Sequence, residues 1–220
     1  MLFRSHAQVD TTHLYADLNS SYAKYLQSKM YESAVTVLSN ADSLVPVRWK
    51  DSLRIASVVI GDKKNNPFQQ MIHRYTPCEF YAIEKNEATD VFESVKKYLT
   101  NHDLVILSIH GTTMKADKNF GITDQEEKFI EEVLNSYPAI LVDFGNAYTL
   151  TRIRNLSKAK AVILGYEDTA VMHDATAQVL FGGIKATGKI PIRSAEAFPK
   201  GTGIETMPPV RFKYSNPEDA

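Results

Sequence analysis

The sequence predicts an α/β fold, a three-layer α/β/α sandwich built on a mostly parallel sheet. First, 44% of the 220 residues are hydrophobic, which is enough for one large core. Second, strand-like and helix-like segments alternate after residue 50, and such repetition requires right-handed parallel crossovers. Third, the strand-like segments are apolar at nearly every position, which is typical of strands covered on both faces.

Five strands and four connecting helices follow from these patterns. The expected strands are 54–61, 78–84, 102–111, 138–146 and 159–167, and the expected helices are 66–75, 86–99, 122–137 and 168–183, with a helical turn at 147–153. Two helix starts carry specific signals. Asn66 precedes Pro67, and Thr123 is followed three residues later by Glu126, which is the spacing of a capping box.

The two ends of the chain differ from this repeating pattern. We expect an N-terminal extension over residues 1–18, then a lead-in helix and short strand over 19–50. The sandwich domain is expected to occupy 51–206. Residues 207–220 contain prolines and become polar, which indicates a linker or a tail.

Charge and composition exclude several classes of function. The 25 Lys and Arg nearly balance the 26 Asp and Glu, so nothing favours binding to nucleic acid or to an anionic membrane. No apolar run approaches the ~20 residues that cross a bilayer, and the first ten residues lack the apolar core of a signal peptide. Cys78 is the single cysteine, so it forms no intrachain disulfide, and we expect a small buried apolar residue there. No metal or cofactor is expected.

One stretch imitates a nucleotide-binding motif. Residues 181–193 read FGGIKATGKIPIR, and the part from Gly183 to Lys189 matches seven of the eight positions of a P-loop. A working P-loop follows a strand and opens a helix, whereas this stretch ends a helix. Ile190 also stands where a Ser or Thr would hold Mg²⁺. We therefore expect a helix end at Gly182 or Gly183, a turn at residues 187–188 and a last extended segment.

Ligands of parallel sheets bind at the carboxyl ends of the strands, so these ends are the place to look for a site. His110 ends the third strand, where a titratable ring would lie at the crevice; the alternative is a histidine that is hydrogen-bonded to loop backbone. Asp168, His173 and Asp174 are close in sequence, but offsets of five and six do not align on one helix face. An acid beside Thr169 also suits a helix start. No catalytic constellation is predicted.

The segment 161–192 carries a family resemblance. Its strand is followed by an acidic-Thr pair, an Ala-rich helix that ends A-Q-x-L-F-G, and a G-K-I-P-I run, as in the C-terminal α/β sandwich domain of glycoside hydrolase family 3. It is most similar to the β-N-acetylhexosaminidase branch. Residues 143–150 resemble the family's F-G-N-P-Y-x-L turn, with Ala147 in place of proline, and 18–47 resemble the lead-in from the catalytic barrel. The residues that match in 161–192 are Tyr166, Glu167, Asp168, Thr169, Ala177, Gln178, Leu180, Phe181, Gly182, Gly188, Lys189, Ile190, Pro191 and Ile192.

The resemblance implies a non-catalytic domain of a β-N-acetylglucosaminidase-like enzyme. Such a domain packs beside an upstream (β/α)₈ barrel, whose catalytic groups lie in a K-H-F-P-G-H-G-like region that these 220 residues lack. The isolated chain is therefore expected to be inactive. The resemblance also implies a carbohydrate substrate of the full enzyme, an extracytoplasmic bacterial location and, in some members, a β-lactamase-like domain downstream. Strand-end residues His110, Asn146 and Glu167 are the candidates to border the sugar site.

Two other functions are compatible with the same pattern. One is a free-standing module, flavodoxin-like in general layout, that binds a small ligand in the strand-end crevice. The other is a structural spacer between flanking domains. Neither requires a sugar or a barrel.

Overall fold

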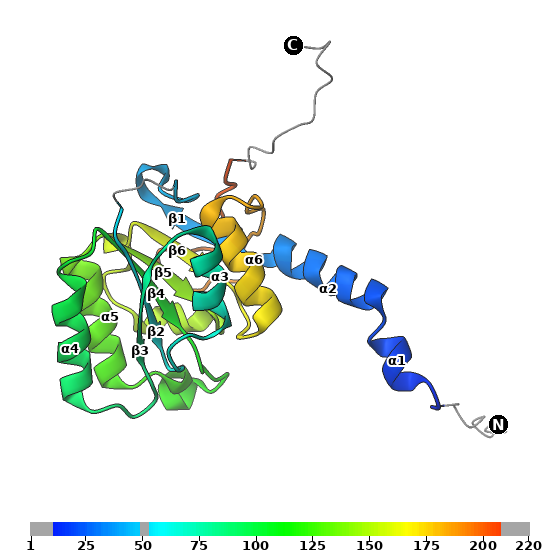
Figure 1. The fold of residues 1–220 in the computed structure, drawn as a ribbon, viewed down its shortest axis with the longest axis horizontal. Helices are drawn as coiled ribbons and strands as arrows, with labels where there is room; N and C mark the ends of the chain where they lie inside the picture. The colour runs from blue at the N-terminus through cyan, green and yellow to red at the C-terminus, as the bar shows by residue number, and fades with distance from the viewer. Residues whose placement is uncertain (1–10, 49–52, 208–220) are drawn as a thin grey trace, which may run out of the picture.

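The computed structural model describes residues 11–48 and 53–207, and in them a central sheet of six strands (Figure 1). The strand order is β1-β6-β5-β4-β2-β3. All neighbours are parallel except β1 and β6, which are antiparallel. The strands are β1 (Thr36–Asn40), β2 (Ile55–Ile60), β3 (Glu79–Ile83), β4 (Leu104–Ile109), β5 (Ala139–Asp143) and β6 (Ala161–Leu164).

Helices cover both faces of this sheet and complete the predicted three-layer sandwich. One apolar core joins the sheet to α3 and α6 through side chains such as Phe68 and Met172. A second core joins the other face to α4 and α5 through Phe92 and Phe129. The helices are α1 (Leu14–Leu18), α2 (Ser21–Ala34), α3 (Pro67–Tyr75), α4 (Thr89–Leu99), α5 (Asp124–Ser136) and α6 (Ala170–Phe181), and the 3₁₀ segments are η1 (Ala41–Ser43), η2 (Ala116–Gly121), η3 (Ala147–Arg152) and η4 (Leu156–Lys158).

The helix-start signals in the sequence act as expected. The Asn66 side chain accepts a hydrogen bond from the Gln69 N–H at the start of α3. Thr123 and Glu126 form the reciprocal capping box of α5. One start was placed too early: α4 begins at Thr89 rather than at residue 86, because Asn86 has a φ of 64° and a left-handed residue cannot begin a right-handed helix.

The stretch that imitates a P-loop is a helix end. Gly182 caps α6 in the left-handed conformation, with a φ of 76°, and the Gly183 N–H donates to the Gln178 carbonyl at 2.7 Å. The bend lies at residues 182–184, and the structure assigns no turn to residues 187–188, contrary to expectation. Ile190 does not join the sheet; its N–H donates to the Thr202 carbonyl at 2.8 Å.

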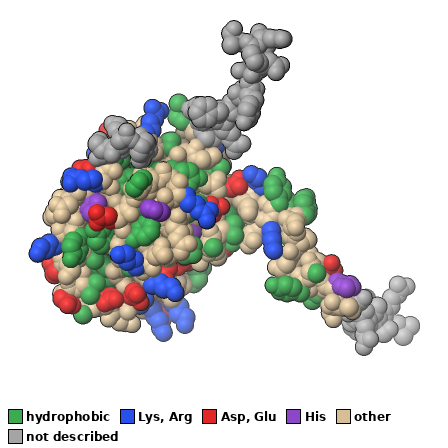
Figure 2. Space-filling model, viewed as in Figure 1, with side chains coloured by type: hydrophobic (Ala, Val, Ile, Leu, Met, Phe, Trp, Pro, Cys, Tyr) green, Lys and Arg blue, Asp and Glu red, His purple; other side chains and the backbone are tan. Residues whose placement is uncertain are grey.

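The N-terminal segment forms an arm that projects from the sandwich (Figure 1). We define the arm as α1 and α2, and neither helix has a buried residue. Large apolar side chains along the arm are exposed, among them Tyr15 at 82%, Tyr22 at 68% and Met30 at 73%, and Figure 2 shows them as green surface on the arm. A helix of this length gains most of its stability from packing an apolar face. α2 packs on the sandwich core at its inner end, through Tyr31 and Ala34, while the apolar side chains farther out stay exposed.

Some expectations concern parts of the chain outside the described residues. Residues 1–10 of the expected extension and 208–220 of the expected tail belong to this group. Among the helices that are described, none is long and apolar enough to cross a membrane.

The left-handed cap at Gly182 generates a test of stability. Gly182→Ala should lower the free energy of unfolding by at least about 1–2 kcal/mol, because an L side chain is strained at positive φ and the new Cβ would lie 3.0 Å from the Pro46 Cβ. Thermal unfolding measures the loss. Gly201→Ala is the matched control, since its φ is 88° with nothing within 4 Å, and it should cost only the strain. A Gly182→Ala protein as stable as the parent would contradict the assignment.

Candidate functional site

The sheet has a topological switch point between β2 and β4. From β2 the chain crosses to β3 on one side, and then returns past β2 to β4 on the other side. Ligands of open α/β sheets bind outside the carboxyl ends of the strands that flank such a point. Asp62 and Asn66 follow β2, and His110 directly follows β4. His110 therefore lies at the position where this class of fold holds its ligands.

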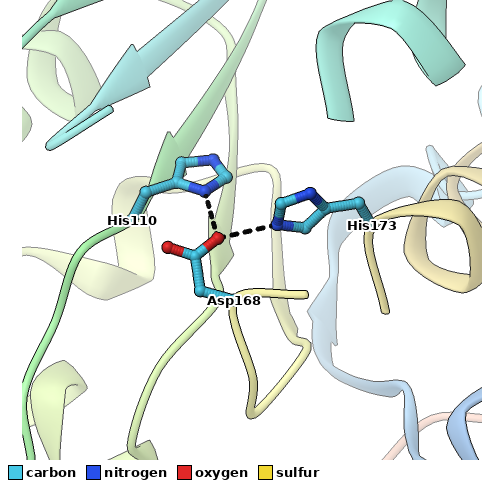
Figure 3. A group of neighbouring side chains, drawn as sticks. All are labelled: His110, Asp168 and His173. Carbon is cyan, nitrogen blue, oxygen red and sulfur yellow. Dashed lines mark hydrogen bonds and ion pairs between the residues drawn. The ribbon is translucent and has the colours of Figure 1, made fainter. Parts of the chain in front are cut away.

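Three side chains meet at this edge of the sheet (Figure 3). The Nδ1 atom of His110 lies 2.9 Å from Oδ1 of Asp168, and Nε2 of His173 lies 2.8 Å from the same oxygen. The second oxygen of Asp168 accepts the backbone N–H of Gly111 at 2.8 Å. The end of β4, the loop after β6 and the first turn of α6 are thereby joined at one carboxylate. We call His110, Asp168 and His173 the histidine–aspartate cluster.

Burial and hydrogen bonding set the charge of this cluster. Burial lowers the pKa of His110, and this effect outweighs the opposite influence of Asp168. Burial alone would raise the pKa of Asp168, but hydrogen bonds from His110 and His173 lower it well below its usual range. Asp168 is thus an anion at neutral pH, and His110 is a neutral ring.

The ring of His110 is held on both sides. Because Asp168 is ionised and only accepts, His110 donates through Nδ1, and its Nε2 accepts from Ser108 Oγ at 3.0 Å. Phe144 packs against both histidines, with ring centroids 4.9 Å from His110 and 4.4 Å from His173. Phe68 packs on Phe144 from α3. The two rings are therefore enclosed by apolar groups, and only Asp168, with 32% of its side chain exposed, reaches solvent.

The sequence reading separated Asp168 from His173, and that interpretation was wrong. It treated both residues as positions on one helix face, where an offset of five does not pair. Asp168 instead precedes the N-cap residue Thr169, so its side chain lies outside the helix and can turn back to the first turn of α6. The side chain of His110 likewise bonds Asp168 and Ser108, not loop backbone. The sequence did carry a signal for this pair: an acid stands just before an N-cap threonine, and a histidine follows in the first turn of the helix.

The three candidates for a sugar border occupy different settings. His110 has no exposed surface, so its ring does not face solvent. Asn146 is partly exposed and caps η3 by accepting the Tyr148 N–H. Glu167 is exposed and accepts a hydrogen bond from the hydroxyl of Tyr31 on α2. Among the residues with described positions, no hydrogen bond links the three.

Glu167 borders a groove of about 530 Å³. The groove lies between α2 and the loop after β6, and Tyr166 and Met172 contribute to its wall. Tyr166 has a φ of 64°, an uncommon conformation for a bulky residue. Such strain clusters at ligand-contacting positions, and here it sets the direction in which the chain presents Glu167.

Asp143 is a second buried acid, on the opposite face of the sheet. Strand alternation places it with Leu141 on the α4 and α5 side. Both carboxylate oxygens are buried without a hydrogen-bond partner in the described structure. Burial, and then the charge of Asp168, raise the pKa of Asp143 well above its usual value. The Asp143 carboxyl is thus neutral under conditions that ionise an exposed aspartate.

Cys78 is half-buried rather than fully buried as expected. Burial raises the pKa of its thiol to about 12, so the reactive thiolate does not form at neutral pH. Cys78 thus acts as a small apolar residue that is partly exposed.

Comparisons with known proteins show which proteins have a similar fold. No family model matches the chain, and no curated protein matches it either. Solved structures do match. A family 3 β-N-acetylglucosaminidase from Paenibacillus sp. str. FPU-7 matches 78% of this chain with 32% of its own, at 14% identity and a TM-score of 0.62. A β-glucosidase from Listeria innocua matches 79% with 27% of its own, at 15% identity and a TM-score of 0.60.

A fungal multi-domain family 3 β-N-acetylglucosaminidase matches more of the chain. It covers 92% of this chain with 22% of its own, at 16% identity and a TM-score of 0.58. The chain thus spans about a third or less of the length of these three proteins. The resemblance to a domain of family 3 glycoside hydrolases, first stated from the sequence, is confirmed at the level of the fold.

The buried acid Asp143 predicts a dependence of stability on pH. Its pKa is raised in the folded state, so its contribution is complete below the unfolded pKa of about 3.9 and is lost as the pH rises toward the folded pKa. This one proton should lower the free energy of unfolding of the parent by up to about 1.4 kcal/mol per pH unit. Asp143→Asn should remove that part of the slope. Urea unfolding from pH 4 to 8 measures the slopes.

The variant should gain stability relative to the parent as the pH rises. Asp117→Asn, which alters an exposed carboxyl after β4, is the control. Parallel pH profiles for the parent and Asp143→Asn would contradict a neutral Asp143.

Proposed function

We propose that this chain is the non-catalytic second domain of a family 3 glycoside hydrolase of the β-N-acetylglucosaminidase type. The catalytic groups lie in an upstream (β/α)₈ barrel, against which this domain packs. We propose that residues 207–220 lead toward a β-lactamase-like domain, which some members of the branch carry. The substrate of the whole enzyme is a carbohydrate with an N-acetylglucosamine unit.

The observation that carries this proposal is the asymmetry of the structural match. The solved proteins of similar fold, two of them named as family 3 enzymes, cover 78–92% of this chain, yet the chain accounts for only 22–37% of theirs. A domain most of which matches, within proteins roughly two to four times as long, is one module of a larger assembly. Two of these proteins are β-N-acetylglucosaminidases, and the segment 161–192 resembles that branch.

The arm supports the same proposal. Its apolar side chains are exposed on α1 and α2, and exposed apolar patches of this kind mark surfaces that bind another protein body. The resemblance places the barrel before this segment, so the arm is the surface nearest to it. Packing of the barrel on the arm would bury the apolar face that the sandwich leaves open.

The border of the sugar site is assigned to the carboxyl edge of the sheet. Glu167 has the exposure and the free carboxylate oxygen to accept a hydroxyl hydrogen bond from a sugar. Asn146 is the second candidate, with a partly exposed amide. His110 is buried and acts through Asp168, which fixes the loop that carries Glu167.

The first test is the activity of the isolated chain. We expect no hydrolysis of an aryl N-acetyl-β-glucosaminide, because these 220 residues lack the K-H-F-P-G-H-G-like region to which the resemblance assigns the catalytic groups. Release of the aryl group, measured under conditions in which the full enzyme is active, tests this expectation.

The coding sequence upstream of Met1 should encode a barrel with a K-H-F-P-G-H-G-like region. Turnover by the chain alone would overturn the non-catalytic assignment, and so would the lack of that barrel.

The second test concerns Glu167 in the full enzyme. Glu167→Gln should lower kcat/KM by about tenfold, mainly through KM, because loss of a charged hydrogen bond costs about 1.5 kcal/mol or more. Glu84→Gln changes another exposed strand-end acid and should leave kcat/KM unchanged. Tyr31→Phe removes only the bond between α2 and Glu167. An equal loss in Tyr31→Phe would contradict direct contact of Glu167 with the sugar.

A further inference from the structure

We propose that the histidine–aspartate cluster is a binding site for one divalent transition-metal ion, with zinc as the reference ion. His110, Asp168 and His173 each offer one ligand atom, and these atoms all lie within 4.8 Å of one another. Two imidazoles and one carboxylate form the donor set of many zinc sites that keep an open position. This proposal does not depend on the assignment to glycoside hydrolases.

The spacing of the ligand atoms suits a first-row ion. Zinc bonds to nitrogen and carboxylate oxygen are about 2.0–2.2 Å long, so neighbouring ligands of a tetrahedral site lie roughly 3.3 Å apart. Asp168 Oδ1 lies 2.9 Å from His110 Nδ1 and 2.8 Å from His173 Nε2. Each of these two separations therefore needs to widen by only about half an ångström. The two ring nitrogens lie within 4.8 Å of each other and need to approach to about the same spacing. Both ring nitrogens already face the same oxygen, as Figure 3 shows.

Outer partners hold two of the three ligands in place. In the metal-bound tautomer His110 carries its proton on Nε2, which then donates to Ser108 Oγ at 3.0 Å. Asp168 keeps the Gly111 N–H on its second oxygen at 2.8 Å. His173 Nδ1 is buried and has no partner within the described structure. Because an outer partner is worth roughly 10- to 100-fold in affinity, we expect this site to bind more weakly than one in which all three ligands are held.

The surroundings leave one direction open for a fourth ligand. Phe68 and Phe144 pack behind the two rings, and both histidines are buried. Asp168 alone is partly exposed, at 32% of its side chain. Water would therefore complete the coordination from the Asp168 side. Two imidazole ligands favour zinc, cobalt or nickel over magnesium and calcium, which prefer oxygen ligands.

The ion would cross-link the end of β4 to the loop after β6 and the start of α6. His110, which follows β4, and Asp168, in the loop after β6, are 58 residues apart. That loop carries Glu167 next to Asp168. Occupation of the site would therefore fix the direction in which the domain presents Glu167.

Zinc titration of the chelator-treated, dialysed chain tests the site. Isothermal titration calorimetry should give one site, and bound cobalt should show the visible absorption of a four- or five-coordinate ion. Magnesium should give no heat at the same concentrations. His173→Gln can still donate a hydrogen bond to Asp168 but removes a ligand, so it should weaken zinc binding by at least roughly tenfold. Asp168→Asn should weaken it further.

Matched variants separate this site from other histidines. His102→Gln and His73→Gln alter histidines that lie outside the cluster, and both should bind zinc as the parent does. Circular dichroism of each metal-free variant checks that the fold is intact. Zinc binding weaker than about 100 µM by the parent, or equal binding by folded His173→Gln and the parent, would overturn the proposal.

Discussion

The carboxylate of Asp168 is the interaction on which the carboxyl edge of this domain depends. Its two oxygens accept three N–H hydrogen bonds. The donors are His110 at the end of β4, Gly111 beside it and His173 on α6. A partly buried carboxylate is stable only when such donors replace the water that it loses. These donors also tie the loop after β6 to the centre of the sheet. The position of Tyr166 and Glu167 therefore follows from the charge of one neighbouring residue.

The His110 and Asp143 side chains lie on opposite faces of the sheet, and their buried polar atoms are accommodated differently. On the α3 and α6 face, His110, Ser108 and Asn66 have partners and form a connected network. On the α4 and α5 face, Asp143 has none, and the raised pKa of its carboxyl is how it avoids a buried charge. Connected networks make a core unique, whereas an unpaired acid weakens it. The geometry around His110 is thus fixed by hydrogen bonds, whereas the carboxyl of Asp143 is held by packing alone within the described structure.

Sequence patterns predicted most of the fold because each element carries its own local signals. Apolar runs located β2, β4 and β5, and Thr123 with Glu126 located the start of α5. The same reasoning gave the position of His110 but not its partners. Contacts between His110 and Asp168 span 58 residues, and no local period reports them. The Asp168–His173 pair was missed because the helix period was applied to a residue that lies before the helix.

The bond between Tyr31 and Glu167 has a mechanical consequence. Tyr31 lies near the inner end of α2, and the 14 residues of this helix extend about 21 Å. A stiff rod of that length, held at its inner end and free at its outer end, is a lever. Force applied to the far end acts at Glu167 with a long moment arm. The orientation of any body attached there is thereby transmitted to Glu167, an exposed acidic side chain at the carboxyl edge of the sheet.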